Sequence, residues 1–304
     1  MAAVNLKQLA KMLNLSISTV SKALRDSHEI GDATKLRVLA KAKEMDYTPN
    51  PFASGLRRNK SKTIAVVVPE VANNYFALAI NGIERIAQEN DYHVLIYLTH
   101  EDIEKEKGIM KHLENKRVDG VLMSVTMNTN NQTHLSDFQQ KGIPIVFFDR
   151  ICHEIETAKV TTDDYISGIN ATKHLIENEC KDIAFLSLGE DISIMQKRKS
   201  GYLEELHKNN MEAKTERIIK CGNDDEINYD LVKKLLRGKN KPDAIFASVE
   251  KLAITTYQVC RELNINIPKD VKIICFSNLE TASLLSPSLS TITQPAYNIG
   301  KTAA

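Results

Sequence analysis

Short apolar runs alternate with segments of helical periodicity between residues 63 and 276. The run TIAVVVP at residues 63–69 is continuous and rich in β-branched side chains, which is typical of a parallel strand buried on both faces. The segment that follows it has apolar residues at helical spacing, namely Ala77, Ile80, Ile83, Ile86 and Ala87. Because strands and helices alternate strictly, we expect an α/β fold with parallel, doubly wound sheets and helices on both faces.

This alternation divides into two α/β units of similar size, joined near residues 150–162. A chain of 304 residues is too long for one compact core, which agrees with several domains. The expected strands are residues 63–69, 93–98, 120–124, 144–149, 159–162, 182–188, 217–221, 244–248 and 272–276. The expected helices of this region lie near residues 77–87, 103–116, 135–141, 165–178, 195–209, 229–237 and 251–263.

The residues that follow the expected strands are polar, mainly Asn, Asp, Ser, Thr and Arg. An open α/β sheet binds its ligand at these carboxyl ends, and such side chains suit a hydroxyl-rich ligand such as a sugar or nucleoside. No Gly-x-Gly-x-x-Gly or Walker loop follows a strand, and there is no Gly-x-Ser-x-Gly elbow or metal-ligand spacing. We therefore expect no cofactor, no metal and no enzymatic activity.

The first 46 residues have a different pattern, three short helices with a tight turn between the first two. Asn5 and Gln8 form a capping box, and Ser16 can cap the second helix. The first helix has an apolar face made of Leu6, Leu9, Ala10 and Leu13. In the second, Ile17, Val20 and Leu24 are expected to point inward beside Ala23, leaving outside Ser18, Thr19, Ser21, Lys22 and Arg25. This pattern is typical of a helix-turn-helix.

A third helix is expected from its cap at Asp32 to about Met45. It can close a three-helix core with Leu36, Leu39, Ala40 and Ala42. The alternative is a small helical bundle with solvated charge. The charge distribution favours DNA binding: residues 1–62 contain twelve Lys and Arg against five Asp and Glu, whereas the chain as a whole is only +1. A basic head on an acidic body indicates a nucleic-acid partner for the head.

The N-terminus lacks the apolar run of a signal peptide, and no stretch approaches the roughly 18 apolar residues of a membrane span. The five cysteines are widely spaced and include no Cys-x-x-Cys pair. That spacing fits reduced thiols better than disulfides or a metal site. We expect a cytoplasmic protein without a membrane partner.

Two prolines, Pro49 and Pro51, end the helical headpiece and force an extended connection. Residues 52–58 could form one or two helical turns, but Gly55 costs about 1 kcal/mol against Ala there. A segment this short does not hold a helix by itself in water. Sequence alone leaves open a plain basic linker or a helix that something else orders.

Four motifs in this order and spacing identify a resemblance that runs from Asn5 to Ala304. They are LAKMLNLSISTVSKAL at residues 9–24, Tyr-Thr-Pro-Asn at 47–50 followed by Ala53 and Leu56, Val-Asp-Gly at 118–120, and PSLSTITQPAYNIGKTAA at 287–304. The chain resembles the lactose-repressor (LacI/GalR) family of bacterial transcription regulators. The resemblance implies a helix-turn-helix headpiece and a bilobal body like type I periplasmic binding proteins. It also implies a homodimer that binds a pseudo-palindromic operator under control of a small effector.

The resemblance carries DNA-contacting roles onto residues of the headpiece and linker. The base-reading positions are Ile17, Ser18 and Lys22, although a phosphate contact by Lys22 is an equal alternative to a guanine contact. The DNA-backbone positions are Asn5, Ser16, Thr19, Ser21 and Asn50. The hinge positions for the minor groove are Ala53, Leu56 and Arg57, with Leu56 matching a side chain that wedges between central base pairs. Gly55 departs from the family and should make the hinge more dependent on DNA or effector for its order.

The resemblance also carries effector binding onto the cleft between the lobes. The positions are Asn74, Tyr75, Phe76, Arg150, Arg198, Glu250 and Ser277. Tyr75 and Phe76 could instead be core residues, and Arg198 has basic neighbours to which the role could slip. Ser277 stands where the family usually has an Asp that grips ligand hydroxyls, and Glu250 stands where Asp is usual. A standard sugar-binding mode is thereby put in doubt, and a modified or acidic effector or a cleft without a ligand is the alternative.

The expected domains are a DNA-binding domain at 1–48 and a hinge at 49–62. An N-terminal subdomain at 63–160 is completed by 291–304, and a C-terminal subdomain covers 161–290. The family fold continues past the position of Ala304, so its C-terminal end is expected to be truncated here. Alternatives to a ligand-controlled repressor are an effector-independent regulator, a solute-binding protein without a DNA role, and an α/β enzyme. The solute-binding alternative leaves the basic head unexplained, and the enzyme lacks a nucleophile or metal constellation.

Overall fold

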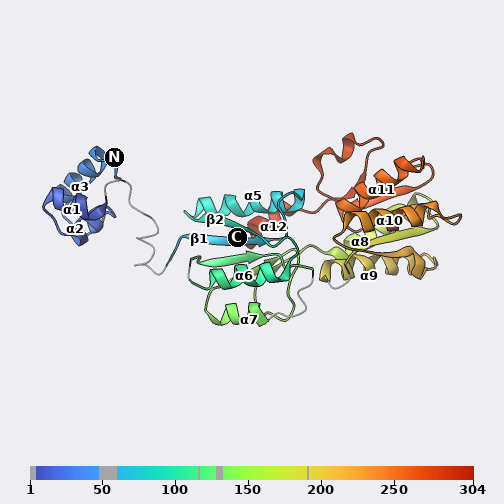
Figure 1. Ribbon diagram of the computed structural model, residues 1–304, viewed down its shortest axis with the longest axis horizontal. Helices are drawn as coiled ribbons and strands as arrows, with labels where there is room; N and C mark the ends of the chain where they lie inside the picture. Colours follow the sequence, from blue (N-terminus) through green and yellow to red (C-terminus); the bar gives the residue numbers. More distant parts are fainter. Residues whose placement is uncertain (1–4, 48–59, 116, 128–132, 190–191) are drawn as a thin grey trace. The chain divides into compact units, whose positions relative to one another are not determined.

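The computed structural model describes residues 5–47, 60–115, 117–127, 133–189 and 192–304 (Figure 1). The chain forms two compact units, a headpiece within residues 1–61 and a body of residues 62–304. The predicted hinge positions Asn50, Ala53, Leu56 and Arg57 lie outside the described residues. Among the described residues, no helix combines the length and apolar character needed to cross a membrane.

The headpiece contains three helices, α1 (Leu6–Leu13), α2 (Ile17–Ala23) and α3 (Asp32–Glu44). The predicted capping box is present, because Asn5 Oδ1 accepts from Gln8 N at 2.9 Å and Gln8 Oε1 accepts from Asn5 N at 2.9 Å. Ser16 caps α2 by accepting from Thr19 N at 3.0 Å. The buried core of the headpiece is Leu9, Ala10, Val20, Ala23, Val38 and Ala42.

The prediction for α3 was wrong in its phase. Leu36 and Leu39 are 68% and 50% exposed and Ala40 is exposed as well, whereas Val38 and Ala42 face the core. Val38 and Ala42 are four residues apart and share one helical face, and the leucines lie off that face. Ile17 was also wrongly placed inward, since it is 41% exposed at the start of α2. Asp32 is the first helical residue, and Gly31 is the cap.

The first sheet of the body has five parallel strands in the order β2-β1-β3-β4-β5. They are β1 (Thr63–Val68), β2 (His93–Leu98), β3 (Gly120–Met123), β4 (Ile145–Phe148) and β5 (Lys159–Val160). The connecting helices are α5 (Asn74–Glu89), α6 (Ile103–Leu113) and α7 (Thr133–Gln140). Alternate residues of β1 point to opposite faces: Ala65 and Val67 pack with α6 and α7, and Val66 and Val68 pack with α5.

The second sheet also has five parallel strands, in the order β10-β9-β8-β6-β7. They are β6 (Ile183–Leu188), β7 (Ile218–Cys221), β8 (Ala244–Ala247), β9 (Lys272–Phe276) and β10 (Ser290–Ile292). The helices are α8 (Asp164–Glu177), α9 (Ser193–Lys208), α10 (Asp225–Arg237) and α11 (Glu250–Glu262), with short 3₁₀ turns at Thr215–Arg217 and Glu280–Leu284. These two doubly wound parallel sheets confirm the predicted fold class.

The predicted return of the chain to the first lobe at residue 291 was too early. Thr291 and Ile292 pair with Cys275 and Phe276 in the second sheet, so β10 is an edge strand of the C-terminal lobe. The chain crosses only after it, and α12 (Ala296–Ala303) packs on the first lobe beside α5. The apolar residues of β10 had no pattern that could tell one sheet from the other, because either sheet offers a parallel neighbour.

Two pairs of helices cross at backbone contact, and glycines make both crossings possible. A Cβ on Gly82 of α5 would lie 2.1 Å from Tyr297 O, and one on Gly300 of α12 would lie 1.9 Å from Ala79 O. Between α8 and α9, a Cβ on Gly168 would lie 2.5 Å from Arg198 O. This second crossing brings the start of α8, which carries Asp164, next to Arg198 of α9.

Replacing Gly168 with alanine should therefore destabilise the body. The new methyl group must push α8 and α9 apart, which we expect to lower the free energy of unfolding by about 1–3 kcal/mol. Gly108→Ala is the matched control, because Gly108 is exposed inside α6 and has no atom within 4 Å of its added Cβ. That variant should be up to about 1 kcal/mol more stable. Urea denaturation measures both, and equal effects would contradict the role of the crossing.

Candidate functional site

A cleft lies where the carboxyl ends of the two sheets of the body meet. Six segments line it: the start of α5, the end of β4, the start of α9, the start of α11, the end of β9 and the segment after β10. The lining residues are Asn73, Tyr75, Phe76, Asp149, Arg150, Ile194, Met195, Arg198, Val249, Glu250, Phe276, Ser277, Asn278 and Gln294. The cleft has a volume of only about 50 Å³.

Arg198 is 2% exposed, and its guanidinium contacts three residues of its own lobe. Its Nε donates to Asp164 Oδ1 at 2.7 Å, and its Nη1 donates to the carbonyl oxygen of Ser248 at 2.6 Å. The guanidinium carbon lies 3.6 Å from the centroid of the Phe276 ring, a close cation–π contact. The positive charge of Arg198 is thus compensated before any ligand enters.

Asp164 is saturated in the same way. Its second oxygen, Oδ2, accepts from Thr162 Oγ1 at 3.2 Å, and that hydroxyl in turn accepts from Gln294 Nε2 at 3.2 Å. Gln294 also accepts at its backbone oxygen from Asn278 Nδ2 at 2.7 Å. The segments that connect the lobes are therefore hydrogen-bonded to the buried ion pair.

Arg150 is held from the first lobe. Its Nη1 donates to Glu101 Oε1 at 2.6 Å, and Glu101 Oε2 accepts from Met127 N at 3.0 Å. Arg150 is 7% exposed, and its Nε is buried without a hydrogen-bond partner. That Nε is a donor at the cleft that a ligand oxygen could satisfy.

Asp149 is a buried carboxylate with few compensating contacts. It is 6% exposed, and the hydroxyl of Ser124 donates to its Oδ2 over a long 3.4 Å. Burial raises the pKa of Asp149 from its ordinary 3.8 to about 6, and the positive charges of Arg150 and Arg198 oppose that shift without cancelling it. Its backbone has a φ of 61°, a left-handed conformation that Asp and Asn tolerate better than most residues.

Tyr75 lies close to these charges. Its own burial and the negative charges of Asp149 and Asp164 raise the pKa of Tyr75 well above its ordinary value. The phenol therefore stays neutral and can serve as a donor. The ring meets Phe76 edge-on, with 5.5 Å between centroids.

Ser277 and Glu250 form one unit across β9 and α11. The hydroxyl of Ser277 donates to Glu250 Oε2 and accepts from Leu279 N at 3.0 Å. The resemblance predicted that position 277 lacks a carboxylate, and the structure shows that the hydroxyl there contacts the carboxylate of Glu250 from α11. Glu250 keeps its other oxygen out of this hydrogen bond.

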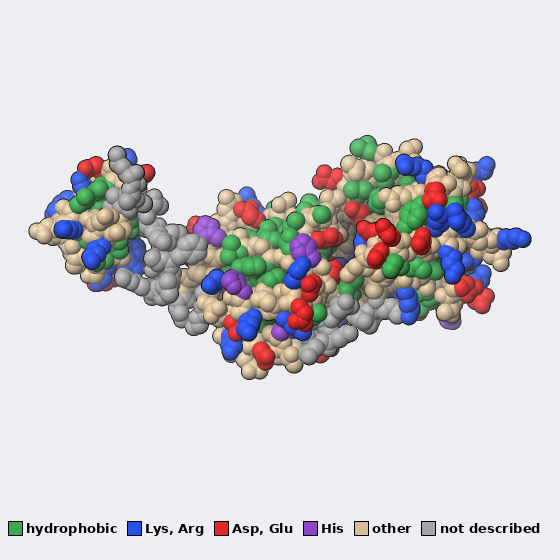
Figure 2. Space-filling model, viewed as in Figure 1, with side chains coloured by type: hydrophobic (Ala, Val, Ile, Leu, Met, Phe, Trp, Pro, Cys, Tyr) green, Lys and Arg blue, Asp and Glu red, His purple; other side chains and the backbone are tan. Residues whose placement is uncertain are grey.

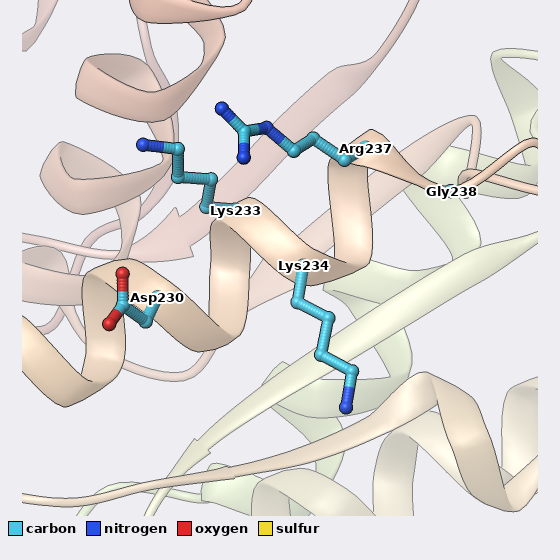
Figure 3. Close-up of a pocket in the computed structure, with 5 residues that line it drawn as sticks. All are labelled: Asp230, Lys233, Lys234, Arg237 and Gly238. Carbon is cyan, nitrogen blue, oxygen red and sulfur yellow. The ribbon is translucent and has the colours of Figure 1, made fainter.

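A second hollow of the body, of about 510 Å³, lies on α10 (Figure 3). Its lining comes from one helix and its end, whereas six segments line the cleft. Lys233 and Arg237 leave one side of the helix and Lys234 leaves the other, so the cations do not converge. Lys233 and Arg237 also pair with Glu262 at 2.6 and 3.9 Å. We regard the cleft between the sheets as the candidate ligand site.

The described residues hold no group of His, Cys, Asp and Glu that could bind a metal ion. All five cysteines are free and buried. Burial raises the pKa of Cys221 to about 11 and that of Cys260 to about 11, so these thiols are neutral near pH 7.

The headpiece presents the predicted DNA-contacting residues on and beside α2. Ile17 and Ser18 are exposed, and the side chain of Lys22 is 40% exposed. Several Lys and Arg side chains show on the visible face of the headpiece (Figure 2). The hydroxyls of Ser16, Ser18 and Thr19 form a cluster with separations of 2.8 Å from Ser16. Ser21 accepts from Arg25 through both its carbonyl oxygen and its hydroxyl.

Six of the seven effector positions expected from the sequence line the cleft, and Asn74 does not. Asn73 lines it instead, because it is the extended cap of α5, whereas Asn74 is the first helical residue. The effector positions expected from the family did not include the lining residues Asp149, Asn278 and Gln294, although Asp149 and Asn278 lie in the polar segments that follow expected strands. Asp149 had a detectable signal, since it is the first polar residue after the run that ends at Phe148. That the lining residues bind an effector stays a prediction.

Comparison with known families now bears on this geometry. The family model described as periplasmic binding proteins and sugar binding domain of LacI family matches residues 61–304. The model of bacterial regulatory proteins, lacI family, matches residues 5–50. The chain belongs to the LacI family. Its helix-turn-helix and its periplasmic-binding-protein-like body are thus both family domains.

Similar LacI-family proteins are transcription regulators. Catabolite control protein A of Priestia megaterium is 28% identical over 303 residues, which cover 99% of this chain and 90% of that protein. The transcriptional repressor PurR of Aliivibrio salmonicida is 28% identical, covering 98% of this chain and 89% of the repressor. The transcriptional repressor CytR of Escherichia coli is 28% identical, with coverage of 99% and 88%.

Solved structures share the fold of this LacI-family chain. The Lac repressor dimer bound to operator and an anti-inducer superposes with a TM-score of 0.84 at 18% identity, covering 99% of this chain and 90% of that one. The regulator CelR in complex with cellobiose gives a TM-score of 0.73 at 23% identity, with coverage of 99% and 91%. At these identities the likeness establishes the fold.

Asp149→Asn should stabilise the protein at neutral pH. The pKa of the Asp149 carboxyl is higher in the folded protein than in the unfolded chain, so the free energy of unfolding falls as the pH rises from about 4 through about 6. For a shift of this size the loss is about 3 kcal/mol at most. The amide removes the charge and tolerates the left-handed backbone. We expect the free energy of unfolding of the variant to be about 1–3 kcal/mol higher than that of the parent at pH 7.5, and the difference to disappear towards pH 4.5.

The matched control is Asp164→Asn, on the other lobe. It leaves the buried Arg198 without its carboxylate, so we expect a loss of about 3–5 kcal/mol. Denaturation at a series of pH values measures both variants. A stability loss in Asp149→Asn at neutral pH would contradict the assigned role of burial.

Proposed function

We propose that this protein is a repressor that binds a pseudo-palindromic operator as a homodimer and is controlled by a small polar effector in its cleft. The observation that supports this most is the pairing of an exposed, basic helix-turn-helix with a body whose cleft buries incompletely satisfied polar groups. A repressor of this kind acts in the cytoplasm, where the DNA is. A solute-binding role would use the body and leave the headpiece without a task.

The reading face of the headpiece is small, polar and basic. Ile17 and Ser18 at the start of α2 would contact base edges, together with Lys22 one turn further along the helix. The backbone contacts would come from Asn5, Ser16, Thr19 and Ser21, which fix register without reading sequence. Asn50 would add a further backbone contact, and Ala53, Leu56 and Arg57 would form the hinge contacts in the minor groove.

Lys22 has an internal partner that DNA must displace. Its ammonium group pairs with Glu29, and this contact lowers the pKa of the Glu29 carboxyl. Both side chains are well exposed, so the exchange of Glu29 for a guanine or phosphate oxygen is inexpensive.

Lys22→Ala tests sequence reading. Footprinting of the parent protein across genomic fragments should first find a palindromic site that outcompetes random DNA. On that site the Lys22→Ala variant should lose about 1–3 kcal/mol of binding free energy and discriminate less between bases at one position. Lys43→Ala is the control, an exposed lysine of α3 that should weaken binding to all sequences alike or not at all. A uniform loss in the Lys22 variant would assign Lys22 to phosphate, and the absence of any preferred site would contradict the proposed function.

The second copy has a suitable surface on the first lobe. Strand β2 is an edge strand that pairs only with β1 among the described strands. Two adjacent residues within it, Leu95 and Ile96, are 41% and 46% exposed. Successive residues of a strand point to opposite faces, so each face of β2 has one exposed apolar residue in the middle of the strand, whereas Val94, Tyr97 and Leu98 pack against the body. Hydrophobic side chains also gather on the visible face of the body (Figure 2). Edges of this kind favour association with another chain.

Ile96→Glu should weaken the dimer. A charge in an apolar interface is costly to desolvate, so we expect the dissociation constant to rise at least tenfold and operator affinity to fall with it. Ile166→Glu on α8 is the control, since Ile166 is also 46% exposed. Sedimentation velocity over a concentration series measures both. A dimer unchanged by Ile96→Glu would place the interface elsewhere.

A further inference from the structure

We propose that the cleft is selective for a hydroxylated amine that is protonated near pH 7, such as an amino sugar, and that it excludes anionic ligands. The inference deepens the proposed function and rests on it only in taking the cleft as the effector site. It follows from which cleft atoms are already paired and which remain open.

The two arginines that could bind an anion are both committed. Arg198 donates to Asp164 and to a main-chain oxygen while stacking on Phe276. Arg150 donates to Glu101 at 2.6 Å. An anionic ligand finds only Arg150 Nε open, and any stronger grip on either guanidinium would have to break one of these pairs and leave a buried carboxylate uncompensated, which is strongly unfavourable.

The open groups are mostly acceptors. Asp149 accepts a long hydrogen bond from Ser124 and interacts with the Tyr75 hydroxyl, which leaves acceptor positions on its two oxygens, and Glu250 uses one oxygen for Ser277. Asn278 Oδ1 is buried and has no hydrogen-bond partner. These three side chains line one cavity, so they call for a ligand rich in donors.

The charges of the cleft point the same way. Six charged side chains line the cleft or pair directly with its lining, four acids (Glu101, Asp149, Asp164 and Glu250) and two bases (Arg150 and Arg198). The excess is two negative charges. In a buried site such an excess attracts a cation and repels an anion much more strongly than in water.

The remaining lining suits the body of an amine. The apolar side chains Ile194, Met195 and Val249 and the rings of Tyr75 and Phe76 contribute hydrocarbon and aromatic surface. Aromatic surface beside carboxylates is a favourable environment for an ammonium group.

One open donor explains why the ligand should also carry hydroxyls. Arg150 Nε is buried and unpartnered, and its distance of 3.9 Å from Asp149 Oδ2 is too long for a hydrogen bond. A hydroxyl oxygen of the ligand can accept from it while the amine binds the nearby carboxylate. The cleft of about 50 Å³ is far smaller than ordinary ligand sites, so a sugar ring enters only when the lobes separate.

The test compares matched sugars on the full chain at pH 7. Glucosamine, galactosamine and mannosamine are each measured against the parent hexose and its 6-phosphate by thermal shift and isothermal titration calorimetry. We expect at least one amine to bind at least tenfold more tightly than its parent, and no phosphate ester to bind. Asp149→Asn should reduce that preference to less than threefold, whereas Ile166→Glu should leave it intact.

The inference is overturned if a phosphate ester or a neutral parent binds as tightly as its amine, or if no amine shifts the melting temperature. Operator binding without ligand is measured on the same preparations. Amine preference without operator binding would refute the regulator and leave the ligand class standing. Operator binding without any amine preference would refute the ligand class and leave the regulator standing.

Discussion

Arg198 is a buried charge whose burial depends on three partners from the C-terminal lobe. Asp164 compensates the charge, the Ser248 carbonyl accepts a hydrogen bond, and the Phe276 ring covers one face. Each partner comes from a different element, so the guanidinium joins the starts of α8 and α9 to the ends of β8 and β9. The glycine crossing of α8 and α9 makes this possible, because a larger residue at Gly168 would separate the two charges. These contacts of Arg198 fix the C-terminal wall of the cleft, which Arg198 and Phe276 line.

The carboxylates of the cleft divide into two kinds. Asp164 is paired on both oxygens and serves the fold, whereas Asp149 is buried with weak support and is retained against a stability penalty. Groups kept in an unfavourable state are typical of binding sites, where a ligand supplies what the protein does not. Glu250 belongs to the same set as Asp149, since one of its oxygens accepts from Ser277 and the other takes no part in that hydrogen bond.

Sequence patterns predicted the helices and strands of the body well, since β-branched runs and helical periodicity are local signals. They failed where two arrangements satisfy the same pattern. The α3 helix contains apolar residues on two faces, and only contact with α1 and α2 selects Val38 over Leu36 and Leu39. In the same way β10 could pair with either sheet, and the position of β9 decided it.

The sequence by itself determined the parallel sheets and the basic headpiece through local periodicity and residue order, and its motifs determined the family, whose resemblance pointed to six of the lining residues. Only the tertiary structure decided which polar atoms are paired. Arg198 and Asp164 are 34 residues apart, and Arg150 and Glu101 are 49 apart, so no local pattern connects them. Whether a charge is free to meet a ligand is a property of such long-range contacts. The sequence could therefore show that a polar cleft exists, and the packing of the lobes decided that most of its open groups are hydrogen-bond acceptors.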